Sequence, residues 1–531
     1  MMKKPLFQSQ KKDIIRISQL TFTALFLLST PSLIDAYYPQ TKTVKAETQS
    51  PFTKYETKES HKLQDGATFS KLVYGKANQE DAFMVDLDFF SSNNKAVKLK
   101  EKLASEGYDS FIHTINERAQ DDQKQEPLGY LVRIGPYQAE SQAKILKEEL
   151  ASKGYSDSKV VFTGEDRDAT TGPWVVRVLE INPKTFKGHI SPVLANDQVP
   201  GKEKLTSMSK RLNALGGING GYFVMGPKDG TEGDLAGISM VDGKLISEAV
   251  NGRTSLILND KNQGSISTVN TKLSIQTSKG DKMEIDGLNR VPGLIRGCGG
   301  AGDKETNQAK HDYTCTDSSE LIQYSSHFGP NTPSGEGAEA VINSKGIVTE
   351  IREVRGGKIP EGSTVLSGTA ENAQWIQAHL VDGEKVNIKK KIVTEEGAIS
   401  SREEIGIING GPRLLQDKKI DIPATAEGFH QPDNPEFFYQ FGERRHPRTA
   451  AGIKADGTIL LVTIDGRKPG YSVGANFKES AQILKSLGAV NALNLDGGGS
   501  TTMTVNQKLV NTPSDASGER PVGDGILLLP R

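Results

Sequence analysis

An internal duplication is the feature that most constrains how this chain can fold. The stretch "FMVDLDFF" (83–90) aligns with "YLVRIGPY" (130–137), and "KLKEKLASEGYDS" (98–110) aligns with "ILKEELASKGYSDS" (145–158). In each copy a strand-like alternation of apolar and polar residues precedes a helical pattern that closes on a glycine. The strand-like runs "SFIHTI" and "SKVVFTG" follow the two helices. We therefore predict a ferredoxin-like βαββαβ unit, in which two helices cover one face of a four-stranded sheet.

This unit resembles the SPOR domain, a bacterial module that binds peptidoglycan glycan strands. The resemblance depends on the "VRIGPY" strand, the "A-x-x-L-x-x-x-L-x-x-x-G-Y" helix and the repeat itself, and we assign it residues 81–165. It implies that peptidoglycan glycan strands are a partner of this protein. The alternative interpretation is a ferredoxin-like packing domain without a ligand.

The N-terminus indicates export. Lysines and an arginine precede the apolar stretch "LTFTALFLLSTPSLI", which is short for a membrane span and is typical of a signal peptide. We predict that residues 1–46 are a signal peptide cleaved after Ala36 or Ala46, or an uncleaved N-terminal anchor. The protein is then secreted or associated with the cell wall. The polar residues 47–80 are predicted to be a linker.

Size and composition narrow the class of protein. A chain of 531 residues should form at least two domains, since one core rarely grows past ~300 residues. The net charge of −1 argues against nucleic acid as a partner. The only two cysteines, Cys298 and Cys315, can form a disulfide in an exported chain or remain free thiols. Zinc is not expected, because no further cysteine or close histidine pair accompanies them.

Four apolar runs in the C-terminal two thirds of the chain end in the same way, on Asn or Asp followed by Gly. These runs are "GGINGGYF" (216–223), "IGIINGGPRLL" (405–415), "LLVTIDGR" (460–467) and "ALNLDGGGS" (492–500). Each one alone is most simply a hairpin turn. Four of them, each after a run that looks buried, favour a shared edge that faces a ligand.

The third and fourth runs can be placed relative to one another. Between them lies "ANFKESAQILKSLGAV", a helix with Asn476 as its cap, Glu479 completing a capping box and Gly488 after its last turn. A strand–helix–strand crossover makes the two strands parallel. Asp465 and Asp496 are therefore expected at the same carboxyl edge of the sheet, where α/β proteins bind ligands. Two carboxylates in one crevice are the arrangement that enzymes use to cleave glycosidic bonds.

Positive charges flank these strands. Arg448 and Arg467 are suited to holding a phosphate, and the "GGGST" turn offers backbone N–H groups and hydroxyls. We therefore interpret these arginines and the turn as an anion-binding site rather than as solvated charges on the surface. No P-loop lysine, nucleophile elbow, metalloprotease histidine pair or calcium-loop spacing is present, so no metal or other cofactor is predicted, and calcium is not indicated.

In this order, "NGGYF", "GGPRLL", "HPRTAAGI", "VTIDGR", "ALNLDGGGSTTM" and "NTPSDASGERPVGDGILL" resemble the phosphodiester glycosidase family, to which the uncovering enzyme of the lysosomal mannose phosphate pathway belongs. The resemblance spans about 170–531. It implies a larger glycine-rich domain with mixed sheets, so that the whole chain is of the α/β (mixed α+β) class. Strand-rich insertions such as 265–335 account for the size of this domain.

The resemblance implies roles for individual residues. Asp496 and Asp465 become the carboxylates that stabilise an oxocarbenium-like centre or activate water, and Arg448 becomes a phosphate clamp. The spacing leaves open which aspartate is the base. The residues implied to line the crevice or cradle the substrate are Asn219, Gly220, Gly221, Asn409, Gly410, Gly411, Arg467, Gly497, Gly498, Gly499, Ser500 and Thr501. Ser514, Asp515 and Arg520 match a late family motif, for which a structural turn is the alternative.

The function that these features predict is hydrolysis of the glycosidic bond in sugar-1-phosphodiesters, of the N-acetylglucosamine 1-phosphate type, in cell-wall or surface polysaccharide. A phosphate monoester is a good leaving group, so such a site needs cations more than a strong general acid. The alternative is a cell-wall binding or assembly protein that uses the same crevice without hydrolysis. A nuclease or phospholipid phosphodiesterase is disfavoured, because such enzymes usually depend on metals.

Overall fold

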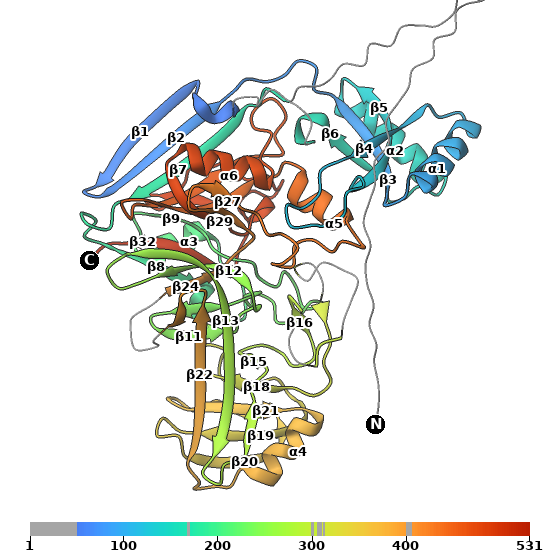
Figure 1. Ribbon diagram of the computed structural model, residues 1–531. Coiled ribbons are helices and arrows are strands. Elements are labelled where there is room, and N and C mark those ends of the chain that lie inside the picture. Colours follow the sequence, from blue (N-terminus) through green and yellow to red (C-terminus); the bar gives the residue numbers. More distant parts are fainter. Residues whose placement is uncertain (1–49, 167–169, 299–301, 305–310, 312–313, 400–405) are drawn as a thin grey trace, which may run out of the picture. The chain divides into compact units, whose positions relative to one another are not determined.

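The structure is a computed structural model that describes residues 50–166, 170–298, 302–304, 311, 314–399 and 406–531 (Figure 1). The predicted signal peptide or anchor, 1–46, lies outside the described residues. In the part of the chain that is described, no helix has the length and apolar character to cross a membrane. Helices and strands are mixed, which confirms the predicted α/β class.

The duplicated region forms the predicted βαββαβ unit. Its elements are β3 (Phe83–Phe90), α1 (Asn93–Ser105), β4 (Ser110–Ile115), β5 (Gly129–Tyr137), α2 (Glu140–Ser152) and β6 (Lys159–Phe162). The sheet order is β4-β5-β3-β6. Val85 and Val132 pack with Leu103 and Leu150 of the two helices in one buried cluster. The prediction is confirmed because each amphipathic helix needs the same sheet face to bury its apolar stripe.

One of the two eight-stranded sheets, called the main sheet below, includes residues that were predicted from the sequence to be a linker. Its order is β1 (Thr57–Gln64), β2 (Ala67–Tyr74), β7 (Trp174–Ile181), β28 (Ile459–Ile464), β27 (Arg448–Lys454), β29 (Ala489–Asn494), β25 (Arg413–Gln416) and β26 (Lys419–Ile420).

The predicted linker 47–80 is therefore corrected. Strand β2 pairs with β7 along its whole length, from Ala67↔Ile181 to Tyr74↔Trp174. Although the segment is polar on average, its strand β2 buries the side chains of Leu72 and Tyr74 against the domain. The βαββαβ unit is thus inserted between two neighbouring strands of the main sheet.

A five-stranded sheet packs against the main sheet. Its order is β31 (Lys508–Leu509), β30 (Met503–Val505), β9 (Gly216–Asn219), β32 (Asp524–Leu529) and β8 (His189–Leu194). Leu461 and Leu493 of the main sheet share a buried cluster with Ile218 and Ile526 of this one. Helix α6 (Phe477–Ser486) covers the opposite face of the main sheet.

Apart from the short pair β16 (Ile295–Arg296) and β17 (Thr314–Cys315), the remaining strands form two further sheets. One contains β11 (Lys244–Ser247), β10 (Ser239–Val241), β24 (Gly406–Asn409), β12 (Arg253–Leu258), β13 (Gly264–Thr277), β22 (Val386–Thr394) and β23 (Gly397–Ile399), with β14 (Lys282–Glu284) beside β13. The other contains β15 (Gly287–Leu288), β18 (Leu321–Tyr324), β21 (Thr364–Gly368), β19 (Gly335–Ile342) and β20 (Val348–Arg355), next to α4 (Ala370–His379). The long pair β13–β22 reaches from the body of the domain toward this second sheet (Figure 1).

The sheet face of the βαββαβ unit that its helices leave open is buried against the larger domain. There the ring of Phe89 stacks on Tyr439, with centroids 5.5 Å apart. Leu131 and Ile115 join the same buried cluster. Tyr439 begins the short π-helical segment Tyr439–Glu443, which follows α5 (Glu436–Phe438) and leads into β27. The unit therefore supports the segment from which β27 starts.

Candidate functional site

The predicted edge is formed where β28 and β29 end and β27 begins. Strand β27 is antiparallel to both neighbours, with Arg448 opposite Ile464 and Ala450 opposite Asn494. Strands β28 and β29 are therefore parallel, as the strand–helix–strand pattern predicts, and Asp465 and Asp496 follow them at one edge. The sequence did not predict that β27 would lie between them.

Three of the four Asn/Asp-Gly turns meet around Tyr222. The amide of Asn219 donates to the carbonyl of Asp496 at 2.7 Å, and Asn409 accepts from the Tyr222 N–H at 2.8 Å. The amide of Asn494 donates to the Tyr222 hydroxyl at 2.7 Å. All three asparagines are fully buried, so they fix the backbones that surround the site. Among the predicted glycines, a Cβ on Gly221 would contact Asn409 and one on Gly410 would contact the carbonyl of Asn494. A Cβ on Gly220 would contact Asp524, and one on Gly411 would contact Glu427 and Phe429.

Asp465 is fully buried, and its carboxylate is occupied by protein groups. Arg177 donates to it at 2.6 Å and the Tyr471 hydroxyl at 3.1 Å. The Thr512 N–H lies 3.3 Å from both oxygens. Asp465 thus anchors the loop that continues to Asp515.

The triple glycine of "DGGGST" lies under two guanidinium groups. A Cβ on Gly498 would lie 3.4 Å from Nη2 of Arg467, and one on Gly499 would lie 2.0 Å from Nη2 of Arg520. Bare backbone is required here because charged side chains rest on it. Arg467 and Arg520 are thereby brought together at the turn that begins directly after Asp496.

Each of these arginines is held by a neighbour. Arg520 makes two hydrogen bonds to Asp515, at 2.8 and 3.1 Å, and both side chains are about a quarter exposed. Nη2 of Arg467 lies 3.1 Å from Nδ1 of His446, and Arg467 is exposed to solvent. Burial holds the pKa of His446 well below its usual value. The two guanidinium groups are accessible to an anion at this turn.

Asp496 is accompanied by a second carboxyl group, Asp524, at the start of β32. Burial raises the pKa of Asp496 to about 6, which the charge of Arg520 partly opposes. The pKa of Asp524 is also raised, to about 7, chiefly by burial and to a smaller extent by the charge of Asp496. Oδ1 of Asp524 accepts from the Gly221 N–H at 2.9 Å, while Oδ2 has no hydrogen-bond partner among the described residues.

The sequence analysis did not single out Asp524. It lies within "RPVGDGILL", where a glycine on each side of an acidic residue opens a buried strand, and that pattern was the available signal.

The remaining predicted residues lie in the turn and loop that follow Asp496. Ser500 is close enough to Asp496 to lower the pKa of its carboxyl group, although the Ser500 Oγ makes no hydrogen bond of normal geometry to the described residues. The carbonyl of Thr501 accepts from the Asn511 amide at 2.9 Å, and Ser514 is partly buried in the loop before Asp515.

Arg448 is buried at the start of β27 and donates to backbone carbonyls. Its Nε bonds to Ala475 at 2.8 Å and its Nη2 to Phe441 at 2.5 Å. The guanidinium lies over the rings of Phe477 and Phe441, at 4.6 and 5.4 Å from their centroids. Burial lowers its pKa to about 10. Arg448 therefore supports the wall of the site rather than its opening.

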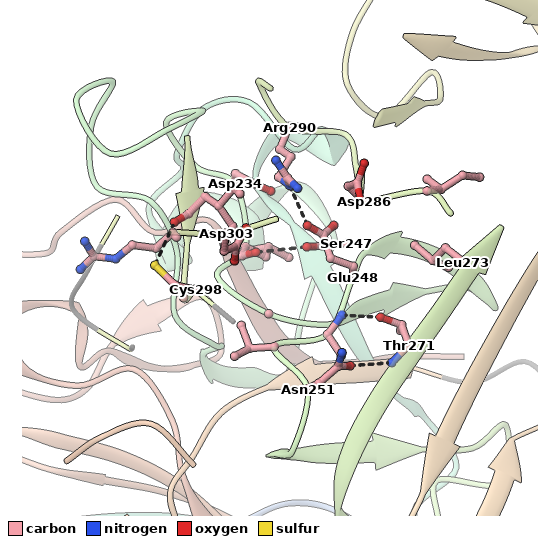
Figure 2. Close-up of a pocket in the computed structure, with 18 of the residues that line it drawn as sticks. Asp234, Ser247, Glu248, Asn251, Thr271, Leu273, Asp286, Arg290, Cys298 and Asp303 are labelled. Atoms are coloured by element: carbon pink, nitrogen blue, oxygen red, sulfur yellow. Dashed lines mark hydrogen bonds and ion pairs between the residues drawn. The ribbon is translucent and has the colours of Figure 1, made fainter. Parts of the chain in front are cut away.

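A separate cavity of about 130 Å³ lies beside the disulfide between Cys298 and Cys315 (Figure 2). Its lining includes Arg290, which bonds to Glu248 at 2.7 Å and to Glu320 at 2.6 Å. Burial raises the pKa of Asp286 there to about 7. The lining comes from loops far apart in the sequence, so no local pattern predicted it.

Across the described residues, no cluster of three or more His, Cys, Asp or Glu side chains has the geometry of a metal site.

Comparison with known proteins matches two parts of the chain to families. Residues 336–529 match the phosphodiester glycosidase family and residues 79–162 match the SPOR domain. The N-acetylglucosamine-1-phosphodiester alpha-N-acetylglucosaminidase of Bos taurus is 43% identical over 172 residues, which is 31% of each chain. The Mus musculus enzyme of the same name is 40% identical over 109 residues, 20% of this chain and 19% of the enzyme. These matches span less than a third of each enzyme.

Two solved structures resemble the whole chain more broadly. A protein of Burkholderia pseudomallei described as exported has a TM-score of 0.80 and 29% identity, over 89% of this chain and 96% of the other. A hypothetical protein from Synechocystis has a TM-score of 0.53 and 18% identity, over 90% of this chain and 80% of the other, and shares the fold. The chain therefore contains a region that matches the phosphodiester glycosidase family and is similar to the N-acetylglucosamine-1-phosphodiester alpha-N-acetylglucosaminidases, and a second region that matches the SPOR domain.

Proposed function

We propose that this protein is an exported bacterial hydrolase that cleaves the bond between the anomeric carbon of a sugar and a phosphodiester in cell-wall or surface polysaccharide. Linkages of the N-acetylglucosamine 1-phosphate type are the proposed substrate class. The observation that carries the proposal is the Asp496 carboxyl group at the start of a glycine turn on which Arg467 and Arg520 lie. An acidic group and two cations thus surround one short stretch of backbone.

The arginines match the group that departs in this reaction. When the glycosidic bond breaks, the phosphate takes the electron pair and gains negative charge. Guanidinium groups and backbone N–H groups stabilise such an anion. The two hydrogen bonds from Arg520 to Asp515 hold its guanidinium in one plane, ready for a phosphate.

The two neighbouring carboxyl groups suit different roles. With a pKa of about 6, Asp496 is mostly ionised at neutral pH and can stabilise positive charge at the anomeric carbon or activate water. Asp524, with a pKa of about 7, is about half protonated, and its charge influences Asp496. We assign the catalytic role to Asp496 and positioning roles to Asp465 and Arg448, because protein groups already occupy the side chains of both.

The SPOR domain and the structural neighbour support the proposed location. SPOR domains bind peptidoglycan, so this domain would hold the protein at the cell wall, near phosphate-linked glycans. The Burkholderia pseudomallei neighbour is described as exported. A secreted or envelope-associated protein would meet such substrates outside the cytoplasm.

The test compares the secreted protein with Asp496→Asn. Both are incubated with UDP-N-acetylglucosamine and with a methyl phosphodiester of N-acetylglucosamine 1-phosphate, and free N-acetylglucosamine is measured. Release by the wild type and loss of release in Asp496→Asn would support glycosidic cleavage at this site. Asp456→Asn is the matched control, since Asp456 lies in the exposed turn between β27 and β28, at the opposite edge of the sheet. No release from either substrate by the wild type would contradict the proposed substrate class and favour a binding protein.

A further inference from the structure

The C-terminal end of the SPOR domain is bonded to the chain that leads into the candidate site. Arg445 donates its backbone N–H to the carbonyl of Glu165 at 2.8 Å, and its side chain donates to the carbonyls of Gly164 and Asp166. The same guanidinium bonds to Glu479, in the first turn of α6, at 2.7 and 2.9 Å. Residues 164–166 are thus held against the segment that carries His446.

A second set of contacts fixes the same residues from the SPOR side. Arg133, which is buried on β5, bonds to Asp166 at 2.8 Å and to Asp86 at 2.7 Å. Asp166 also lies 3.7 Å from Arg444. Because backbone and side-chain bonds converge on Asp166, the neighbouring Glu165 has a defined position.

The Glu165 side chain lies beside Arg444, in the chain that leads into the candidate site. Its Oε2 lies 3.7 Å from Nη2 of Arg444, and only 16% of the side chain is exposed. The charges of Arg444 and Arg467 both act on this carboxylate, and Glu165 is in turn the negative group that raises the pKa of Arg467 most. Arg467 is the residue that rests on Gly498 of the glycine turn.

We propose that Glu165 is the counter-ion of Arg444 and of the phosphate-binding Arg467, so that an anionic ligand must displace the attraction of its carboxylate for Arg467. The SPOR domain then contributes a side chain to the site of the glycosidase domain. This inference rests on the proposed function, because it takes Arg467 to be part of the anion site.

Protonation of Glu165 should release the arginines. Burial raises the pKa of Glu165 to about 7. The groups that face it are Arg444 and Arg467 from the glycosidase domain, Asp166 beside it, and Glu140 at the start of α2. Above its pKa the carboxylate is charged and competes with a ligand anion, whereas below it the group is neutral. Asp496 and Asp524 titrate in the same range, so the test must compare variants at each pH.

The experiment measures binding of sulfate to the secreted protein by calorimetry at pH 8.0 and pH 5.5, since sulfate keeps a constant charge across this range. At pH 8.0, Glu165→Gln should bind sulfate about three- to tenfold more tightly than the wild type, because one partly screened negative charge has been removed. At pH 5.5 the sulfate affinities of the wild type and Glu165→Gln should agree within about twofold. Glu165→Asp, which keeps the charge, should bind weakly at pH 8.0 like the wild type. Glu101→Gln is the control, an exposed carboxylate on α1 of the same domain that should leave the affinity unchanged.

Equal affinities of wild type and Glu165→Gln at pH 8.0, or the same difference at both pH values, would overturn the inference. Absence of sulfate binding by every variant would also contradict it. Thermal unfolding at pH 8.0 confirms that each variant is folded. Sugar release, measured separately, distinguishes the two proposals. If the sulfate affinities follow the expected pattern but no sugar is released, the counter-ion role of Glu165 is supported and the hydrolase function is contradicted. If sugar is released but the sulfate affinities do not follow the pattern, the hydrolase function is supported and the counter-ion role is contradicted.

Discussion

At the scale of single residues, Gly499 decides where two charged side chains can lie. A Cβ at this position would be 2.0 Å from Nη2 of Arg520 and 2.3 Å from Oδ1 of Asp515. With no side chain present, the ion pair rests on the backbone, and the charge of Arg520 acts on the Asp496 carboxyl group. A missing side chain is therefore what allows the Arg520 guanidinium to lie close to the Asp496 carboxyl group.

Substituting this glycine should reduce activity more than stability. In Gly499→Ala the new methyl group displaces the flexible ends of Arg520 and Asp515, so the phosphate loses one charge-assisted partner, and kcat/KM should fall about tenfold or more. Steady-state kinetics and thermal unfolding measure the two effects. Gly226→Ala is the control, since nothing lies near a Cβ at Gly226. An unchanged kcat/KM in Gly499→Ala would exclude Arg520 from the anion site.

The Asp524 carboxyl group should make stability depend on pH. Its pKa of about 7 in the folded protein is above the ordinary value of 3.8, so ionisation is less favourable in the folded state than in the unfolded chain. The stability that it contributes is complete below about pH 4 and is lost as pH rises to about 7. Asp524→Asn should therefore be more stable than the wild type at pH 8, by about 1–3 kcal/mol, with little difference near pH 4. Thermal unfolding across this range measures the difference, and a gap that does not vary with pH would contradict the assignment.

At the scale of elements, helix α6 links the sheet edge to the segment that carries His446. The side chain of Asn476 accepts from the Glu479 N–H at 2.8 Å, and Glu479 accepts from the Asn476 N–H at 3.1 Å. Glu479 also bonds to Arg445, which is tied to the SPOR domain. The helix cap thus takes part in positioning the chain before Arg448.

Removal of this helix cap should lower the stability of the protein measurably. Asn476→Ala should lower the free energy of unfolding by about 1 kcal/mol, the usual effect of losing an N-cap hydrogen bond. Denaturant unfolding provides the measurement. Ser92→Ala is a matched control, because Ser92 is the N-cap of α1 but makes no capping hydrogen bond. If both substitutions cost the same, the capping box of α6 is not the source of the effect.

At the scale of the whole molecule, the SPOR domain is an insertion within the main sheet. Strand β2 precedes it and β7 follows it, and the two strands pair from Ala67↔Ile181 to Tyr74↔Trp174. The inserted domain also buries Phe89 against Tyr439. The glycosidase domain therefore includes residues on both sides of the insertion.

This arrangement predicts the behaviour of a truncated chain. A fragment that begins at residue 170, the domain boundary expected from the sequence, lacks β2 and leaves β7 as an unpaired edge. We expect this fragment to have a lower Tm and a lower soluble yield than residues 50–531, by several degrees at least. Equal Tm values for the two chains would show that the β1–β2 hairpin is dispensable.

Local patterns were sufficient to predict the parts of the fold whose physical cause is local. The repeat with its closing glycines, Gly107 and Gly154, specified the βαββαβ unit, because each strand–helix pair has only one way to bury its apolar face. Asn476 and Glu479 predicted the start of α6 for the same reason. The polar composition of 57–74 obscured two strands, since β1 pairs only with β2, and the other partner of β2 is β7, about 100 residues away in the chain.

The sequence by itself determined which residues could form an anion site, since the "DGGGST" turn, Arg467, Asp515 and Arg520 are all visible in it. Only the tertiary structure decided which of them meet. It directs Asp465 to Arg177 and Arg448 to backbone carbonyls, and it places Asp524 near Asp496 and Glu165 beside Arg444. The physical reason is that a charged side chain takes whichever partner the folded backbone places within hydrogen-bonding distance, and strand order across several sheets sets those distances.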